Sequence, residues 1–160
     1  VVYNPTAGRG RGGEAVAQAK ALLGETFTWI PTVRPGHAIE LAREAARTHP
    51  VVVAFGGDGT VGDVVRGIYG TDAILGIVPV GTGNDVARNV GVPLGLEEAC
   101  RTIHEGTARR IDLGLIDGVP FVNNAGTGFD SRVMQTMNTG IRFARGRSAF
   151  LLAILKTILT

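Results

Sequence analysis

The chain has 160 residues, of which 44% are hydrophobic and 19% charged; this excludes disordered and fibrous classes and allows a buried core. Sixteen basic and 14 acidic residues give a net charge of +2, too weak a bias to predict a nucleic-acid partner. The single cysteine, Cys100, excludes an internal disulfide and fits a reducing cytosol. We therefore expect a cytoplasmic protein in which Cys100 is buried on a helix.

Strand-like and helix-like segments alternate along residues 1–108. Strands are predicted at residues 1–3, 27–33, 51–55 and 74–78, and helices at residues 14–23, 37–48 and 61–69. The runs 51–55 and 74–78 are apolar without alternation, which is typical of parallel strands buried on both faces. The pattern predicts an α/β fold, a three-layer open parallel sheet with helices on both sides.

The pattern changes near residue 109. Residues 110–116 and 119–125 are predicted strands joined by the turn Asp117-Gly118, and helices are predicted at about residues 131–137 and 143–159. Two strands alone are only marginally stable. We therefore expect one α/β domain at residues 1–108 and the incomplete beginning of a second, β-rich domain at residues 109–160.

Glycine-rich runs follow three of the predicted strands, at residues 8–13, 56–59 and 81–83. Open α/β sheets bind their ligands beyond the carboxyl ends of the strands, and glycine lets the backbone approach a ligand closely. These runs are therefore predicted binding loops.

The loop at residues 56–60 reads Gly-Gly-Asp-Gly-Thr between a buried strand and a helix. Its backbone N–H groups and the helix N-terminus can face an anion. Asp58 would repel a bare phosphate, so its presence suggests a cation such as Mg²⁺, bound directly or through water. Thr60 can cap the helix or donate its hydroxyl to a phosphate. The alternative is a tight turn in which Asp58 is only a cap.

The loop at residues 79–88 follows the next buried strand. Gly81 and Gly83 allow a close turn, and Thr82 and Asn84 supply neutral polar groups. Asp85 either caps a helix or joins Asp58 around a hydrated Mg²⁺.

The first loop contains Gly8-x-Gly10-x-x-Gly13, formally a dinucleotide fingerprint. No Asp or Glu closes the second strand, and no Gly-Lys-Ser/Thr is present, so neither a Rossmann site nor a P-loop is predicted. Arg9 and Arg11 are either phosphate ligands or solvated side chains.

Together these loops resemble the diacylglycerol kinase catalytic family, which includes bacterial lipid kinases, sphingosine kinases and ceramide kinases. The similar segments are residues 4–8, 32–38, 56–60, 81–85, 111–114 and 124–130. The sequence at 56–60 also occurs in nicotinamide nucleotide kinases and phosphofructokinases. The loop 81–85 and the pair 111–114 and 124–130 favour the lipid kinases.

The resemblance implies an ATP-dependent kinase of phospholipid metabolism, with ATP bound between two domains and its γ-phosphoryl group transferred to a lipid hydroxyl such as that of diacylglycerol. It implies Mg²⁺ organised through water by Asp58 and Asp85. The implied ATP-binding residues are Asn4, Pro5, Thr6, Ala7, Gly8, Thr32, Gly56, Gly57, Asp58, Gly59, Thr60, Gly81, Thr82 and Asn84. The alternatives are a soluble-substrate kinase of the nicotinamide nucleotide type and a non-catalytic nucleotide- or lipid-binding regulator.

The sequence departs from the family pattern at two places. Family members usually continue Thr-x-Asn-Glu-Val, whereas this chain has Gly62 and Asp63 at the third and fourth positions, which puts contacts from those positions in doubt. The family's proposed catalytic base lies far along the second domain, where this sequence has no counterpart before Thr160. We therefore expect residues 1–160 to bind nucleotide weakly and not to be a competent kinase alone.

Residues 131–160 contain five basic residues and no Asp or Glu, beside the apolar run 150–155. This run is shorter than the about 20 residues that span a bilayer. It is interpreted as a helix packed on further protein, which we favour, or as a helix lying on the inner face of an anionic membrane.

Overall fold

The computed structural model describes residues 1–7, 12–124, 131–133, 135–136 and 147–159. They form two compact units, residues 1–123 and 124–160. The strands are β1 (Val2–Tyr3), β2 (Ile30–Pro31), β3 (Val51–Gly56), β4 (Ile74–Pro79), β5 (Gly114–Ile116) and β6 (Val119–Phe121). The helices are α1 (Gly12–Leu23), α2 (His37–Ala45), α3 (Asp58–Ile68), α4 (Asp85–Asn89), α5 (Leu96–Glu105) and α7 (Arg147–Leu159).

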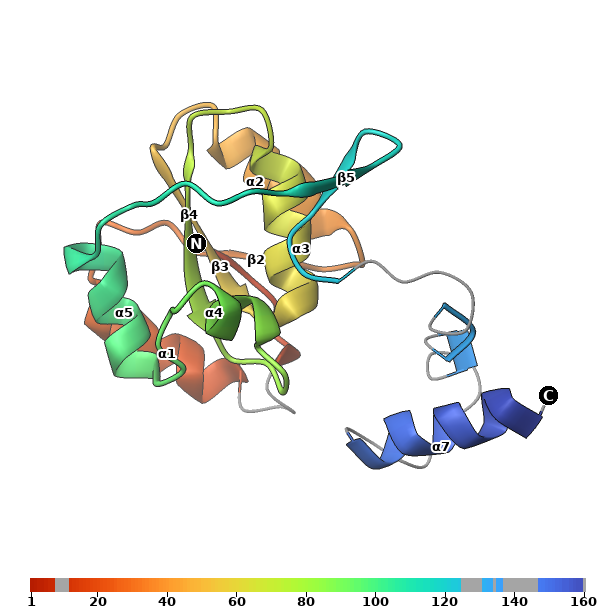
Figure 1. Ribbon diagram of the computed structural model, residues 1–160. Coiled ribbons are helices and arrows are strands. Elements are labelled where there is room, and N and C mark those ends of the chain that lie inside the picture. Colours follow the sequence, from red (N-terminus) through yellow and green to blue (C-terminus); the bar gives the residue numbers. More distant parts are fainter. Residues whose placement is uncertain (8–11, 125–130, 134, 137–146, 160) are drawn as a thin grey trace. The chain divides into compact units, whose positions relative to one another are not determined.

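The first unit is built on a parallel sheet with the strand order β2-β1-β3-β4. Figure 1 shows α1 and α5 on one side of this sheet and α2 and α3 on the other. The predicted α/β fold with a parallel sheet between helical layers is therefore confirmed.

Strand β3 supplies both layers of the core because its side chains alternate between the faces of the sheet. Val52 and Ala54 pack with the residues of α2 and α3, whereas Val53 and Phe55 pack with those of α1 and α5. Cys100 of α5 belongs to the second group and is 1% exposed, as predicted. The continuous apolar run thus has a direct cause, since both faces of β3 are covered.

Strand β2 is much shorter than the predicted segment 27–33. Pro31 has no N–H group to donate to a neighbouring strand, and β2 is an edge strand, where a proline is tolerated. Helix α2 likewise ends at Ala45 rather than at residue 48. Beyond it the backbone turns tighten, because Arg47 N–H donates to Glu44 O and Thr48 N–H to Ala45 O, three residues back instead of four.

Strands β5 and β6 form the predicted antiparallel hairpin. Asp117 and Gly118 both have positive φ, 49° and 77°, as a two-residue turn of type I′ requires. The hairpin groups with the α/β unit by its contacts, and β6 packs against α3. A second domain beginning at residue 109 stays a prediction.

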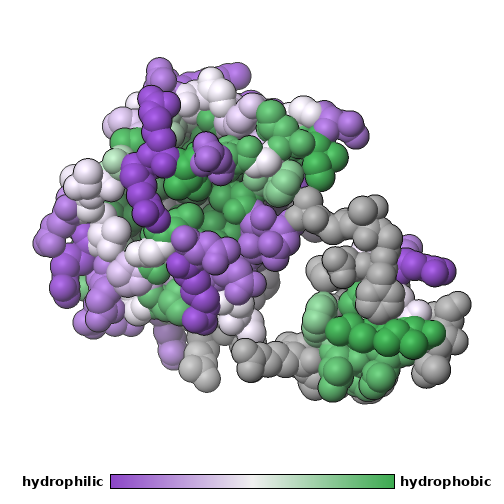
Figure 2. Space-filling view, in the orientation of Figure 1, coloured by the Kyte–Doolittle hydropathy of each residue, from purple (hydrophilic) through white to green (hydrophobic). Residues whose placement is uncertain are grey.

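The second unit contains α7, and residues 131–133 and 135–136 are also helical. Ala153 and Thr157 of α7 are buried, whereas Phe150, Leu151 and Ile158 are exposed, which gives α7 the apolar surface seen in Figure 2. Across the described residues, no helix combines the length and hydropathy that crossing a membrane requires. The predicted motif residues 126–130 lie outside the described residues, as does the start of the predicted helix 143–159.

Candidate active site

The loops singled out by their glycines begin at one edge of the sheet. In the register of the sheet, Tyr3 lies beside Pro31 and Phe55, and Gly56 lies beside Pro79, so all four strands end together. Backbone bonds extend this alignment into the loops. The N–H groups of Asn4, Thr32 and Val80 donate to Phe55 O at 3.3 Å, Tyr3 O at 2.8 Å and Gly56 O at 3.0 Å. Loops far apart in the sequence are therefore neighbours.

Asn4 shapes the loop that follows β1. Its side-chain Oδ1 accepts the backbone N–H of Thr6 at 3.0 Å and the Thr6 hydroxyl at 2.8 Å. Such a local turn is a common use of asparagine. Pro5 and Thr6 are exposed, whereas Gly8, Arg9 and Arg11 lie outside the described residues.

The loops after β3 and β4 touch through their backbones at Gly57 and Gly81. A Cβ added to Gly81 would lie 2.5 Å from Gly57 Cα, and one added to Gly57 would lie 3.1 Å from Gly81 Cα. A side chain at Gly81 would therefore push the loops apart. Close approach between two backbones, rather than positive φ, is what these glycines permit.

Asn84 closes the loop after β4 on itself. Its Oδ1 accepts the N–H of Gly81 at 2.9 Å, and its Nδ2 donates to Gly81 O at 3.0 Å. Asn84 adopts the left-handed conformation, with φ 55°, which asparagine tolerates better than most residues. It is also the residue before α4, yet its side chain does not cap that helix.

Asp58 links the two loops through α4. Its Oδ1 accepts the backbone N–H of Val86 at 2.9 Å. Asp58 is the first residue of α3, so it caps the neighbouring helix α4 rather than its own. Asp58 thus caps α4 through Oδ1, and its other oxygen, Oδ2, takes no part in this bond.

The carboxylates of Asp58 and Asp85 converge on Gly83. A Cβ added to Gly83 would lie 3.0 Å from Asp58 Oδ2 and 3.4 Å from Asp85 Oδ2. The two oxygens are therefore no farther apart than the sum of these distances, and no side chain at residue 83 separates them. Asp58 is half-buried and Asp85 exposed, so the pair faces solvent. Two carboxylates so placed can share a hydrated divalent cation.

Thr60 does not occupy the position of a helix cap. The N-cap residue of α3 is Gly57, and Thr60 lies within the first turn, 9% exposed. Its side chain packs on Gly56, where an added Cβ would meet Thr60 Oγ1 at 2.5 Å. Gly59 and Thr82 are exposed at the same edge.

Thr32 follows β2 and starts a loop that a histidine holds in place. His37 Nδ1 accepts the N–H of Val33 at 3.3 Å, and Arg34 pairs with Glu40 at 2.6 Å. Gly36 completes this turn with φ 75°. His37 lies in the segment 32–38 and is the first residue of the predicted helix 37–48, but the sequence alone indicated no contact for its side chain.

A cavity of about 750 Å³ in the first unit lies elsewhere. It runs along the outer edge of β4 between α5 and residues 106–111, and no predicted nucleotide-binding residue lines it. The candidate site is built instead by the loops that follow the carboxyl ends of the strands.

Known proteins resemble this chain in both sequence and structure. The family model of the diacylglycerol kinase catalytic domain matches residues 1–116. A diacylglycerol kinase of Bacillus subtilis strain 168 is 36% identical over 160 residues, which cover 95% of this chain and 52% of that protein. A diacylglycerol kinase of Mycobacterium tuberculosis strain H37Rv is 36% identical over 162 residues, with the same shares covered. The chain thus spans about half the length of the curated relatives it matches.

A solved structure supports the same grouping. The crystal structure of a diacylglycerol kinase from Bacillus anthracis strain Sterne matches with a TM-score of 0.67 and 29% identity, covering 75% of this chain and 46% of that one. The matched family model includes all the strand-end loops described above. The chain belongs to the diacylglycerol kinase catalytic domain family.

Proposed function

We propose that the protein is an ATP-dependent lipid kinase, which transfers the γ-phosphoryl group of ATP to a lipid hydroxyl such as that of diacylglycerol. Membership of the diacylglycerol kinase family supports the reaction class. The observation that carries the proposal is the convergence of Asp58 and Asp85 beside Gly83, where the loops after β3 and β4 touch. Phosphoryl transfer depends mainly on positioning and charge neutralisation, which such an edge can provide.

The carboxylates fit Mg²⁺ held through water better than an ion enclosed by protein. Among the residues that the structure describes, no group of three or more His, Cys, Asp or Glu side chains gathers as a metal site. Magnesium is commonly held by one or two carboxylates together with phosphates and waters. When bound, the ion would neutralise charge on the transferring phosphate, while Asp58 and Asp85 would orient its water shell.

The remaining loop residues have roles in binding. We assign nucleotide contacts to the loops that begin at Asn4 and Thr32, to residues 56–60, and to residues 81–84. Gly57 and Gly59 lie at the start of α3 and carry no side chain of their own, so we assign their N–H groups to phosphate oxygens. Thr82 is exposed in the loop after β4, and we assign its hydroxyl a contact with the nucleotide. Acceptor contacts and the catalytic base belong to the full-length protein, so we propose that residues 1–160 alone bind nucleotide but turn it over poorly.

Two experiments test this proposal. Calorimetric titration of residues 1–160 with ATP should give binding that strengthens with Mg²⁺ and weakens in Asp58→Asn, a change that keeps an acceptor for Val86 N–H but removes the charge. The full-length protein should transfer labelled phosphate from ATP to diacylglycerol in detergent micelles. Equal or better transfer to nicotinamide nucleotides would contradict the lipid assignment, and rapid turnover by residues 1–160 would contradict the need for further residues.

Helix α7 carries exposed apolar side chains that need a partner to cover them. We infer that this surface is covered in the working protein, either by further protein or by an anionic membrane. Sedimentation of the full-length protein with anionic vesicles, compared for wild type and Arg145→Ala/Arg147→Ala, separates the two. Unchanged sedimentation would leave protein packing as the explanation.

A further inference from the structure

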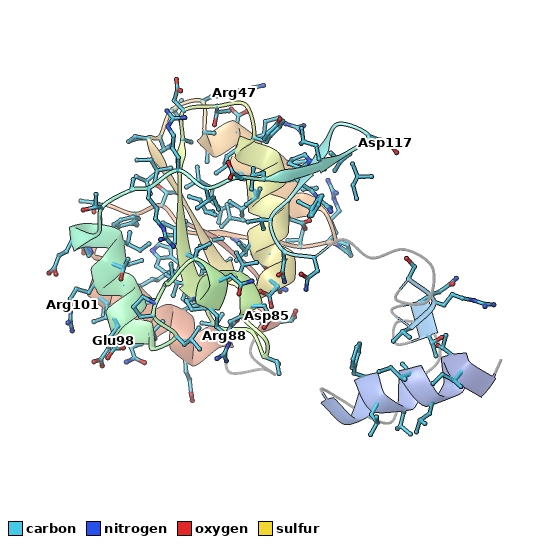
Figure 3. The ribbon with its side chains drawn as sticks, in the orientation of Figure 1. Arg47, Asp85, Arg88, Glu98, Arg101 and Asp117 are labelled. Atoms are coloured by element: carbon cyan, nitrogen blue, oxygen red, sulfur yellow. The ribbon has the colours of Figure 1, made fainter. Side chains whose placement is uncertain are left out.

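The Arg88 side chain is held at the candidate site by a hydrogen bond to the backbone of the loop after β4. Its Nε donates to Gly83 O at 3.2 Å, and Gly83 is the residue on which the Asp58 and Asp85 carboxylates converge. Residues three apart on a helix share a face, so Arg88 lies beside Asp85 on α4. Figure 3 shows Asp85 and Arg88 together at this end of the sheet.

Arg88 is also the positive charge nearest in sequence to the loop that carries Asp85. Residues 56–60 and 80–85 contain two aspartates and no lysine or arginine. Between residues 50 and 90 the only other basic side chain is Arg66, which lies 3.8 Å from Asp63 farther along α3. A magnesium-bound triphosphate keeps a net negative charge, so two aspartates alone leave the site poorly matched to it.

The outer nitrogens of Arg88 are not committed elsewhere. Within the described part of the chain, the Arg88 side chain forms no ion pair, and its one hydrogen bond uses Nε. Arginine presents its donors in a planar fork that suits phosphate oxygens in pairs. With Nε held by Gly83 O, the guanidinium is fixed at its base while both Nη atoms are available.

We propose that Arg88 is a phosphate-binding residue, whose Nη atoms donate to a phosphate group of the nucleotide held by the Asp58 and Asp85 loops. The inference rests on the proposed function, because it requires a nucleotide at this edge. In this proposal Arg88 neutralises negative charge on the phosphates, whereas Asp58 and Asp85 hold the magnesium ion through water. The competing explanation is that Arg88 only stabilises the conformation of the loop after β4, through its hydrogen bond to Gly83 O.

Binding of Mg·ATP and of adenosine to residues 1–160, measured by calorimetry, distinguishes these explanations. Arg88→Gln should raise the Kd for Mg·ATP roughly tenfold or more, because a charge-assisted contact is lost, and leave the Kd for adenosine unchanged. Arg88→Lys should recover part of the ATP affinity because it keeps the charge. Arg101→Gln is the matched control, since Arg101 is exposed on α5 and lies far from Asp85 in Figure 3.

The outcomes separate the inference from the function on which it rests. Equal effects of Arg88→Gln and Arg101→Gln on ATP binding would overturn the role of Arg88. A parallel loss of ATP and adenosine binding that Arg88→Lys does not repair would also overturn it, in favour of stabilisation of the loop alone. Absence of ATP binding by the wild type would overturn the proposed function itself. Thermal melts of each variant establish that the fold is intact.

Discussion

Gly81→Ala tests the contact between the loops after β3 and β4. The added Cβ would lie 2.5 Å from Gly57 Cα and 2.7 Å from Asn84 Oδ1, whereas carbon atoms in van der Waals contact lie about 3.5–4.0 Å apart. The loops must separate by on the order of 1 Å. Overpacking of this kind costs about 1–3 kcal/mol, and weakening the two Gly81–Asn84 hydrogen bonds adds about 0.5–1.5 kcal/mol each.

We expect Gly81→Ala to lower the free energy of unfolding by about 2–6 kcal/mol and to weaken Mg·ATP binding at the same time. Denaturant unfolding and calorimetry measure the two effects. Gly62→Ala is the control, because nothing lies within 4 Å of its added Cβ, and alanine should stabilise the helix by up to about 1 kcal/mol. Unchanged stability and ATP affinity in Gly81→Ala would refute the close approach of the loops.

Three further predictions concern single positions. Gly83→Ala should reduce Mg²⁺-dependent ATP binding roughly tenfold with little change in Tm, since its Cβ would lie 3.0 Å from Asp58 Oδ2; unchanged magnesium dependence would contradict the shared cation. Cys100 should resist Ellman's reagent in the folded protein and react fully in guanidinium, because burial raises the pKa of its thiol; rapid labelling of folded protein would contradict its position in the core. Burial also raises the pKa of the Asp63 carboxyl, and this effect exceeds the lowering of the same pKa by the charge of Arg66. The folded protein therefore loses stability as the pH rises above about 3.9, the pKa of an aspartate in the unfolded chain. Asp63→Asn should therefore raise Tm at neutral pH and lose that advantage near pH 3, whereas a gain that persists in acid would contradict this cause.

The fold was predictable from the sequence because its periodicities are strong. The apolar runs of β3 and β4 indicated strands covered on both faces, and Val52 and Val53 do pack into opposite layers. Asp117-Gly118 indicated a two-residue turn, and both residues have the positive φ it requires. Strand β2 was predicted too long because the apolar residues of 27–33 are typical of a strand. Pro31 cannot donate a hydrogen bond to a neighbouring strand, and the observed pairing ends there.

The site was predictable only in part. Parallel strands with loops at their carboxyl ends place the glycine runs together, and this needs no knowledge of contacts. The bond from Val86 N–H to Asp58 joins residues 28 apart, and no local pattern signals it. The touching of Gly57 and Gly81 is similarly non-local. The position of Arg88, about one helical turn beyond Asp85 on a helix that starts at Asp85, is a local signal that both side chains lie on one face.

Amide chemical-shift mapping of residues 1–160 by NMR tests most directly whether Mg·ATP occupies the edge where the strand-end loops meet. ATP added with Mg²⁺ should shift the amide signals of residues 57–60 and 81–86 most strongly, and omitting Mg²⁺ should reduce the shifts near Asp58 and Asp85. Shifts concentrated around the β5–β6 hairpin, or along the outer edge of β4, would contradict the assignment of this edge as the nucleotide site.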